Sequence, residues 1–434
     1  MDYKYKISVI VPCYNSEKFL KETLDNLLGQ TLREIQVIAV NDGSKDSTAD
    51  IIAEYAAKDS RILSVYQENA GVSAARNNGL QYVEGKYTIF ADSDDLMSTD
   101  ALEKLYNHLE EKKADVAICR VEYFGYGGKR PHPESEALAV LDTIDIYDKR
   151  ILWNFLVSNK CYRSSFLKTS GITFPLKRYA EDGAFCMQIL YKGAKIIGVP
   201  DATMFYRKRE PADGFSVTQS VNYHLVEDLF DCINIIADAA KESFDKPDCT
   251  CKDTDEYIQE LYRRAYSTFV NSLYRLVWSA DKKTVSLMKL KYEELVSKLT
   301  PESKKKIAYV DKDLEKLFFS KSEIASNPFI SVISESPSES FVNSLYNQSM
   351  PYFELITTAD LERENVVTIS EKSFKKNAEK VSKGKIIIVS SGKKPITDSR
   401  LFKVITLLKR NKYFRILPDF VIRIGAAMFL KFKK

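Results

Sequence analysis

An apolar run over residues 86–91 ends abruptly in four polar residues, Asp92, Ser93, Asp94 and Asp95. Because side chains alternate along a strand, Asp92 and Asp94 leave it on the same side. Two carboxylates this close repel each other unless a cation lies between them. Mg2+ and Mn2+ take oxygen ligands from one or two carboxylates and from phosphates. The segment therefore predicts a metal–diphosphate site at the carboxyl end of a strand, with an acidic N-cap for a helix over residues 100–112 as the alternative.

The elements that must hold this segment alternate between strands and helices. Apolar runs predict strands over residues 5–12, 35–40, 62–66 and 86–91, and helical spacing predicts helices between them. This alternation predicts an α/β fold with a mainly parallel, twisted sheet and helices on both faces. Residues 127–150 are polar and contain Gly and Pro, which predicts a loop.

Polar residues follow three of the predicted strands. They are Tyr14 and Asn15, then Asn41 and Asp42, and then Asp92, Ser93 and Asp94. Because the carboxyl ends of parallel strands lie on one edge of a sheet, the three groups are expected to converge on a single cleft. Turn chemistry alone explains any one of them. Their agreement favours a binding site.

Four segments resemble the signatures of family 2 glycosyltransferases with the GT-A fold. They are residues 9–16, 40–48, 71–79 and 91–95, and their order and spacing match as well as their residue types. The resemblance reaches to about residue 215. It implies inverting transfer from a nucleotide sugar, most often a UDP-sugar, assisted by Mn2+ or Mg2+.

The resemblance also implies a set of residues that bind the nucleotide sugar. They are Pro12, Tyr14, Asn15, Asp42, Arg76, Asp92, Ser93 and Arg207. The first three would lie against the base, Asp42 would bond the base or ribose, and Arg76 would face the nucleotide and its phosphates. Asp94 would be the principal metal ligand, and Asp92 would approach the ribose or the metal.

The pair Glu181-Asp182 resembles the catalytic base motif of the family, with Asp182 as the base. Inversion by direct displacement needs a carboxylate beside the acceptor hydroxyl, opposite the leaving diphosphate. The alternative is an acidic N-cap for a helix that continues to about residue 191. Further on, no histidine is present, so Arg207 or Arg209 would supply positive charge to the diphosphate; a solvated basic turn is the alternative.

The rest of the chain predicts two further regions after a catalytic domain over residues 1–220. Residues 221–325 show helical periodicity and are expected to form a helical linker domain. Residues 326–434 are expected to form a degenerate GT-A-like domain, because residues 330–333 repeat residues 7–10, and residues 384–394 parallel residues 85–95. In that second copy the acids are replaced by Ser391, Lys393 and Lys394. Coincidental α/β patterning is the alternative.

The composition of the chain limits the partners and the cellular location that can be expected. The net charge of +4 over 434 residues gives no argument for nucleic acid as a partner, and the seven scattered cysteines fit a reducing cytosol. No signal peptide opens the chain, and no apolar run is long enough to span a bilayer. Residues 411–434 are apolar and basic, which suits an anionic lipid interface, docking on the preceding domain or contact with a second copy of the chain.

Together these features predict an inverting hexosyl- or N-acetylhexosaminyl-transferase at the cytoplasmic face of a bacterial membrane. It would add a sugar to a hydroxyl of a cell-surface glycan, a teichoic acid or other polyol-phosphate acceptor, or a lipid-linked saccharide. A nucleotidyltransferase is the enzymatic alternative. A nucleotide-sugar-binding scaffold without catalysis is the other.

Overall fold

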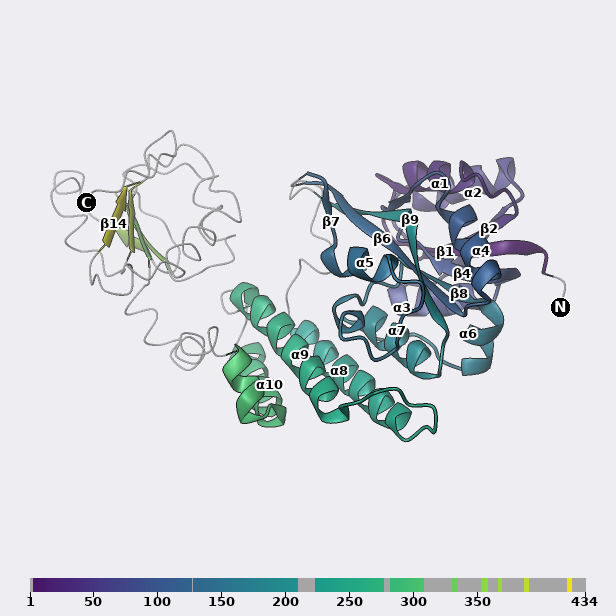
Figure 1. Cartoon of the computed structure of the whole chain (residues 1–434). Coiled ribbons are helices and arrows are strands. Elements are labelled where there is room, and N and C mark those ends of the chain that lie inside the picture. The colour runs from purple at the N-terminus through teal and green to yellow at the C-terminus, as the bar shows by residue number, and fades with distance from the viewer. Residues whose placement is uncertain are drawn as a thin grey trace. The chain divides into compact units, whose positions relative to one another are not determined.

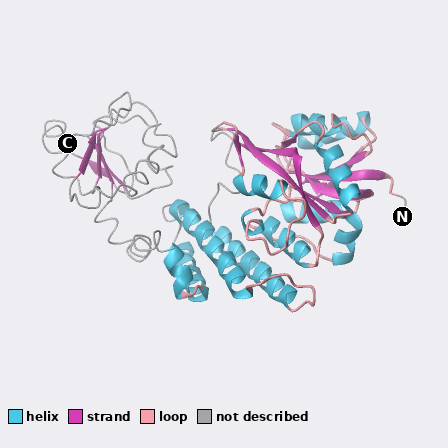
Figure 2. Ribbon diagram, in the orientation of Figure 1, coloured by secondary structure: helices cyan, strands magenta, loops and turns pink. Residues whose placement is uncertain are grey.

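A nine-stranded sheet forms the centre of the N-terminal part of the chain in the computed structural model (Figures 1 and 2). The structure describes residues 3–126, 128–209, 223–276 and 282–307, and five short strands beyond them. The strands of the first sheet are β1 (Tyr5–Cys13), β2 (Ile35–Asp42), β3 (Ile62–Gln67), β4 (Gly85–Phe90), β5 (Leu96–Met97), β6 (Val116–Gly125), β7 (Arg130–Pro131), β8 (Lys160–Arg163) and β9 (Ile196–Lys208). Their order is β3-β2-β1-β4-β8-β6-β9-β5, and β7 pairs with β6.

The sheet is parallel in one half and mixed in the other. Strands β3, β2, β1 and β4 are all parallel neighbours, as the sequence predicts. Beyond β4, strand β8 runs antiparallel to both β4 and β6, and β5 runs antiparallel to β9. The prediction of a mainly parallel sheet therefore holds for the half that ends in Asp92 to Asp95, and the other half is mixed instead.

Helices cover both faces of this sheet (Figure 1). They are α1 (Leu20–Leu28), α2 (Thr48–Lys58), α3 (Val72–Leu80), α4 (Ala101–Lys112), α5 (Pro133–Ala139), α6 (Ser164–Ser170) and α7 (Glu181–Tyr191), with a 3-10 turn over Ile151–Trp153. Alternate residues of β1, such as Ile7 and Val9, join a core with α1, α2 and α4. Ile10, which follows Val9, points to the opposite face of the sheet, toward α3. A Cβ added to Gly79 of α3 would lie 2.6 Å from the Cγ2 atom of Ile10. Glycine at position 79 therefore lets α3 lie close against β1.

Two expectations for local structure are wrong. Residues 127–150 were expected to form a loop, but β7 and α5 lie within them. The acids of residues 92–95 do not cap a helix, because α4 begins only at Ala101 and β5 lies between. Their position therefore excludes the alternative that these acids form the N-cap of the helix over residues 100–112.

Three longer helices follow the sheet. They are α8 (Tyr223–Phe244), α9 (Thr254–Leu276) and α10 (Lys282–Lys298). Residues 1–267 and 290–300 form one compact unit, and residues 268–289 and 301–434 form a second. Helix α8 and the first part of α9 thus belong to the unit that contains the nine-stranded sheet. In the part of the chain that the structure describes, no helix has the length and apolar character needed to cross a bilayer.

The second unit contains a parallel sheet of five strands in the order β12-β11-β10-β13-β14. These strands are β10 (Ile330–Ile333), β11 (Phe353–Thr357), β12 (Val366–Thr368), β13 (Ile386–Val389) and β14 (Phe420–Arg423). Ile330 pairs in register with Phe353 and Ile386, as Ile7 pairs with Ile35 and Tyr87 in the first sheet. A degenerate GT-A-like domain remains a proposal for this region. Residues 391, 393 and 394 lie outside the described residues, as do residues 411–419 and 424–434.

Candidate active site

The polar residues at the carboxyl ends of β1, β2 and β4 are joined by hydrogen bonds. The hydroxyls of Ser16 and Ser93 lie 2.7 Å apart, which links the segments after β1 and β4. The backbone N–H of Asn15 donates to Ser44 Oγ at 3.1 Å, which links the segments after β1 and β2. The three groups therefore converge at one edge of the sheet, as their positions after parallel strands predict. Tyr14 is 48% exposed at this edge.

Asp42 is almost fully buried and holds the loop that leads into α3. Its Oδ1 atom accepts from Gln67 Nε2 and from the N–H of Ala70, both at 2.8 Å. Its Oδ2 atom accepts from the N–H of Gly71 at 2.9 Å and from Asn69 at 3.4 Å. These bonds occupy most of what a carboxylate can accept. A contact of Asp42 with the base or ribose stays a prediction.

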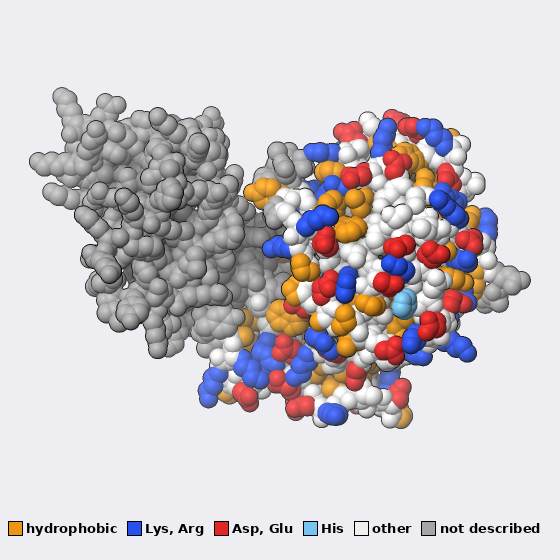
Figure 3. Space-filling model, turned by 45° about the horizontal axis from the view of Figure 1, so that its top comes forward, with side chains coloured by type: hydrophobic (Ala, Val, Ile, Leu, Met, Phe, Trp, Pro, Cys, Tyr) orange, Lys and Arg blue, Asp and Glu red, His pale blue; other side chains and the backbone are white. Residues whose placement is uncertain are grey.

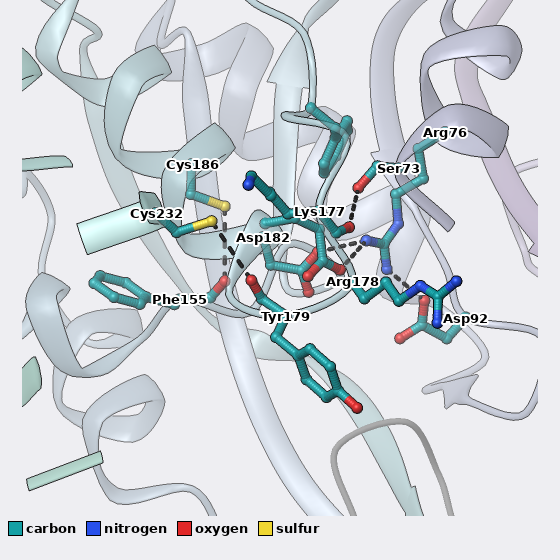
Figure 4. A network of polar contacts seen from close by, with 12 residues as sticks. Ser73, Arg76, Asp92, Phe155, Lys177, Arg178, Tyr179, Asp182, Cys186 and Cys232 are labelled. Carbon is teal, nitrogen blue, oxygen red and sulfur yellow. Dashed lines mark hydrogen bonds and ion pairs between the residues drawn. The ribbon is translucent and has the colours of Figure 1, made fainter. Parts of the chain in front are cut away.

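Arg76 is the hub of the site (Figure 4). It projects from α3, is 3% exposed, and its guanidinium contacts three carboxylates. Nη2 donates to Asp92 Oδ1 at 2.9 Å, and Nη1 donates to Glu181 Oε1 at 3.1 Å and to Asp182 Oδ1 at 2.5 Å. The Cζ atom of Arg76 lies over the ring of Phe174, 5.3 Å from the centre of that ring. Acids that are 90 residues apart in the sequence are thus brought onto one cation, and the predicted contact of Arg76 with phosphates remains untested.

Asp182 and Glu181 open α7 without capping it. The N-cap residue is Ala180, at φ +62°, and the helix shows no side-chain cap hydrogen bond. This excludes the N-cap alternative for the pair. A left-handed alanine costs about 1–2 kcal/mol relative to ordinary backbone, so the surrounding structure holds this turn in place.

Burial raises the pKa of both acids, and the Arg76 guanidinium opposes that rise. For Glu181 the charge of Asp182 raises the pKa further, and for Asp182 the charge of Asp92 does so. A carboxylate that must take a proton from a hydroxyl works best when its pKa is raised toward the working pH. The site therefore gives Asp182 the electrostatic setting of a general base.

Asp94 contacts two arginines at the end of β9. Arg209 Nε donates to Asp94 Oδ2 at 2.6 Å, and Arg207 Nε donates to the Asp94 carbonyl at 2.7 Å. The guanidinium of Arg207 lies between the rings of Phe19 and Phe124, at 4.7 and 4.4 Å, and also pairs with Glu22. Arg207 is therefore packed into the structure and is not a solvated turn. Its role toward a nucleotide sugar remains a prediction.

Asp92 and Asp94 suit a hard divalent ion. Burial raises the pKa of Asp94, the charge of Arg209 opposes that rise, and the charge of the neighbouring Asp92 adds to it. Each carboxylate has one oxygen bonded to an arginine and a second oxygen to offer. Among the described residues no group of three His, Cys, Asp or Glu side chains could hold a metal. A divalent ion here would thus need oxygens from a bound phosphate, which is how Mg2+ is commonly held.

Three residues near α7 carry no signal in the sequence, namely Trp153, Phe155 and Arg264. The buried Lys160, in the segment 159–163 that resembles the family's segment before the acceptor side of the cleft, donates to the carbonyls of Asn154 and Leu156 on either side of Phe155. Trp153 ends the 3-10 turn, Phe155 lies just after it, and Arg264 lies about one hundred positions further along, on α9. Only the folded chain shows that they are neighbours.

The fold defines the class of protein. The structure of Staphylococcus aureus TarS residues 1–349 in complex with UDP-GlcNAc superposes with a TM-score of 0.54, covering 73% of this chain and 93% of that one at 23% identity. The chain therefore has the α/β architecture of a GT-A protein, as the sequence resemblance predicts. Residues 8–180 match the model of Glycosyl transferase family 2, so the N-terminal region is a family 2 glycosyltransferase domain.

Similarity to curated proteins agrees with this assignment. The chain is 31% identical over 243 residues to the poly(ribitol-phosphate) beta-glucosyltransferase of Bacillus spizizenii, which covers 55% of this chain and 37% of that protein. It is 30% identical over 236 residues to the poly(ribitol-phosphate) beta-N-acetylglucosaminyltransferase TarS of Staphylococcus aureus, covering 54% and 40%. The glycosyltransferase GlyA of Streptococcus pneumoniae is 31% identical over 249 residues, covering 54% and 35%. The matched region thus spans between a third and two fifths of these relatives.

Proposed function

We propose that this chain is an inverting glycosyltransferase that moves a hexosyl or N-acetylhexosaminyl group from a UDP-sugar to a hydroxyl of a polyol-phosphate cell-wall polymer. The observation that carries the proposal is the Arg76 hub, which brings Asp92 from the donor edge to the same cation as Asp182 from α7. The relatives named as poly(ribitol-phosphate) glycosyltransferases and the TarS complex with UDP-GlcNAc support the choice of acceptor and donor.

In this proposal the chain's own residues act in fixed positions. Asp182 takes the proton of the acceptor hydroxyl on a carboxylate oxygen while the hydroxyl oxygen attacks the sugar. Arg76 orients Asp182 through the bond between Nη1 and Oδ1, and its charge opposes the rise in the pKa of Asp182 that burial causes. Asp94 and Asp92 would hold Mn2+ or Mg2+, which supplies charge that stabilises the leaving diphosphate.

The Ser16–Ser93 pair and the hydrogen bonds that Asp42 accepts fix the floor of the donor edge. Thr23 reinforces this floor, because its hydroxyl contacts the carbonyls of Ser93 and Asp95 at 3.1 Å. The segment that carries Asp92 and Asp94 is therefore held rigidly, which suits a site that must place two charged groups before the reaction.

The test compares the wild-type chain with Asp182→Asn, using UDP-GlcNAc and UDP-glucose as donors and a ribitol-phosphate oligomer as acceptor. We expect the wild type to release UDP and glycosylate the oligomer, and D182N to lose at least about a hundredfold in kcat. UDP binding by D182N should stay within about twofold, because Asp182 lies across from the donor edge. Glu54→Gln on α2 is a matched control that removes an exposed carboxylate paired with Lys58 and should leave kcat unchanged.

The products separate this proposal from its alternatives. A nucleotidyltransferase would release pyrophosphate instead of UDP. A scaffold would bind a UDP-sugar and transfer nothing, with or without Mn2+. Full transfer by D182N would show that another group takes the proton.

A further inference from the structure

Arg264 on α9 forms no ion pair within 4.0 Å in the described part of the chain, although the charge of Glu134 acts on it from a longer distance. Acids lie one and two turns before it on the same helix, but Glu256 and Glu260 both pair with Arg263, at 2.8 and 2.5 Å. Glu260 also accepts from Trp153 Nε1 at 3.1 Å. The Nη1 atom of Arg264 is buried and has no hydrogen-bond partner.

Two aromatic rings fix the position of this guanidinium. The ring of Phe155 lies 3.9 Å from it, and the ring of Trp153 lies 5.4 Å from it. Stacked rings hold a guanidinium flat and leave the N–H groups on its edge free to donate. Because Glu260 bonds the indole, the Trp153 ring is itself held in place.

The segment that carries Phe155 is held by a second buried cation. Lys160 is fully buried, and its ammonium donates to the carbonyls of Asn154 and Leu156 at 2.9 and 2.6 Å and to Asn159 Oδ1 at 3.0 Å. These partners are all neutral. Asn154 is also buried, and its Nδ2 group has no partner. The segment thus adds a second positive charge and a second unused donor on the side of α7.

This cluster adjoins the helix that carries Asp182. A Cβ at Gly183 would overlap the ring of Phe155, so glycine lets the ring lie directly against the start of α7. The Phe155 carbonyl also accepts from the Cys186 thiol at 3.9 Å, as Figure 4 shows. One side of the Phe155 ring therefore meets the residue after Asp182, and the ring also packs against Arg264.

We propose that Arg264, stacked on Phe155 and Trp153, is a subsite for a phosphate group of the acceptor polymer. This inference rests on the proposed function for its choice of ligand, because a polyol-phosphate chain places a phosphate on either side of the hydroxyl that reacts. An anion at Arg264 would neutralise its guanidinium and accept a hydrogen bond from Nη1, the nitrogen that has no partner. Burial lowers the pKa of Arg264 to about 9, and the charge of Glu134 opposes this shift only in part.

The rigid segment explains how the subsite would serve the reaction. A phosphate fixed at Arg264 would hold the neighbouring hydroxyl of the same polymer near Asp182, since Phe155 contacts Arg264 and also lies against Gly183, the residue after Asp182. Neutral polyols would lack this anchor. The subsite would thus favour acceptors that carry phosphodiesters over uncharged glycans.

Direct binding tests the subsite without any need for catalysis. The chain has two tryptophans, so Trp278→Phe leaves Trp153 as the sole indole reporter beside Arg264. In this background we expect a ribitol-phosphate oligomer to change the fluorescence with saturation, and ribitol to leave it unchanged. Arg264→Met should raise the Kd of the oligomer about tenfold or more, as expected for a lost charge-assisted hydrogen bond. Arg150→Met, which removes an exposed arginine paired with Asp148, should leave the Kd within about twofold.

Further outcomes decide between binding and mere packing. Arg264→Lys keeps the charge, so it should keep affinity within about threefold if the subsite binds phosphate, and should lose it like Arg264→Met if only the stack matters. An unchanged Kd in Arg264→Met, or equal binding of ribitol and its phosphate oligomer, overturns the proposal. In transfer assays Arg264→Met should raise KM for the oligomer and leave kcat unchanged. Binding without any transfer by the wild type would refute the proposed function while leaving the subsite standing.

Discussion

Replacing Arg76 by methionine tests the electrostatic reasoning of the site most directly. The substitution keeps the length and apolar body of the side chain but removes the cation that Asp92, Glu181 and Asp182 share. Removing one partner of a buried ion pair costs about 3–5 kcal/mol, because the other charge is left buried and unpaired. Asp92 and Asp182 are 32% and 27% exposed at their side chains, so water screens them in part. We therefore expect a loss of about 3 kcal/mol in unfolding free energy at pH 8.5.

The same loss should shrink as the pH falls. The pKa of Glu181 in the folded chain is already raised well above its ordinary value, and removing Arg76 raises it further. A group whose pKa is raised by folding adds stability below its unfolded pKa, and this contribution is lost as the pH rises through the folded pKa. In Arg76→Met, protonation of Glu181 removes one of the unpaired charges. The loss at pH 5.5 should then be about half of that at pH 8.5.

Urea unfolding followed by circular dichroism at the two pH values measures this difference. Arg150→Met is the matched control, because Arg150 pairs with a single carboxylate and is 45% exposed, so its loss should stay below about 1 kcal/mol at both pH values. An equal loss for Arg76→Met at pH 5.5 and 8.5 would show that packing, not charge, explains its effect. A loss below about 1 kcal/mol at pH 8.5 would show that the three acids do not depend on Arg76.

Two further predictions concern the metal edge and the fit of α3. Asp94→Asn should raise the Kd for Mn2+ in the presence of UDP about tenfold or more, measured by calorimetry, because an amide is a weaker ligand than a carboxylate; an unchanged Kd would place the ion elsewhere. Gly79→Ala should cost about 1–3 kcal/mol in urea unfolding, because its Cβ would lie 2.6 Å from Ile10 Cγ2 and 3.3 Å from Val40 Cγ2. A loss below about 0.5 kcal/mol for Gly79→Ala would contradict the packing argument.

The face of the N-terminal unit in Figure 3 carries acidic and basic side chains interspersed, with apolar side chains between them. This pattern agrees with the small net charge of the chain. The distribution of charge on this face therefore gives no guide to the acceptor. Recognition of a charged polymer would have to come from particular side chains, and Arg264, whose Nη1 atom has no hydrogen-bond partner, is the candidate proposed above.

The strand register of the second sheet can be compared with the register of the first sheet, whose sequence it partly repeats. Residues 7, 35 and 87 of the first sheet and residues 330, 353 and 386 of the second pair in the same pattern, and residues 330–333 are identical to residues 7–10. Apolar runs of similar length and spacing were enough to predict a parallel sheet there. They did not predict β14, which lies parallel to β13 where the first sheet has the antiparallel β8 beside β4.

Local patterns in the sequence determined the parallel half of the sheet and the edge where the polar residues meet. Short apolar strands alternate with helices there, and each polar group follows its strand directly, so neighbours in sequence are also neighbours in space. The sequence also marked Asp92, Asp94 and Asp182 as the acids of interest, because their motifs are contiguous. It failed beyond β4, where β8 and β5 run antiparallel because of how distant segments pack.

Tertiary structure alone decided which arginines contact these acids. No local pattern shows that Arg76 lies between Asp92 and Asp182, or that Arg209 pairs with Asp94, because these contacts join elements about 15 to 115 positions apart. The same holds for Arg264 and Phe155, which are brought together by the packing of α9. Backbone propensity acts over a few residues, whereas the pairing of buried charges depends on which surfaces the whole fold encloses.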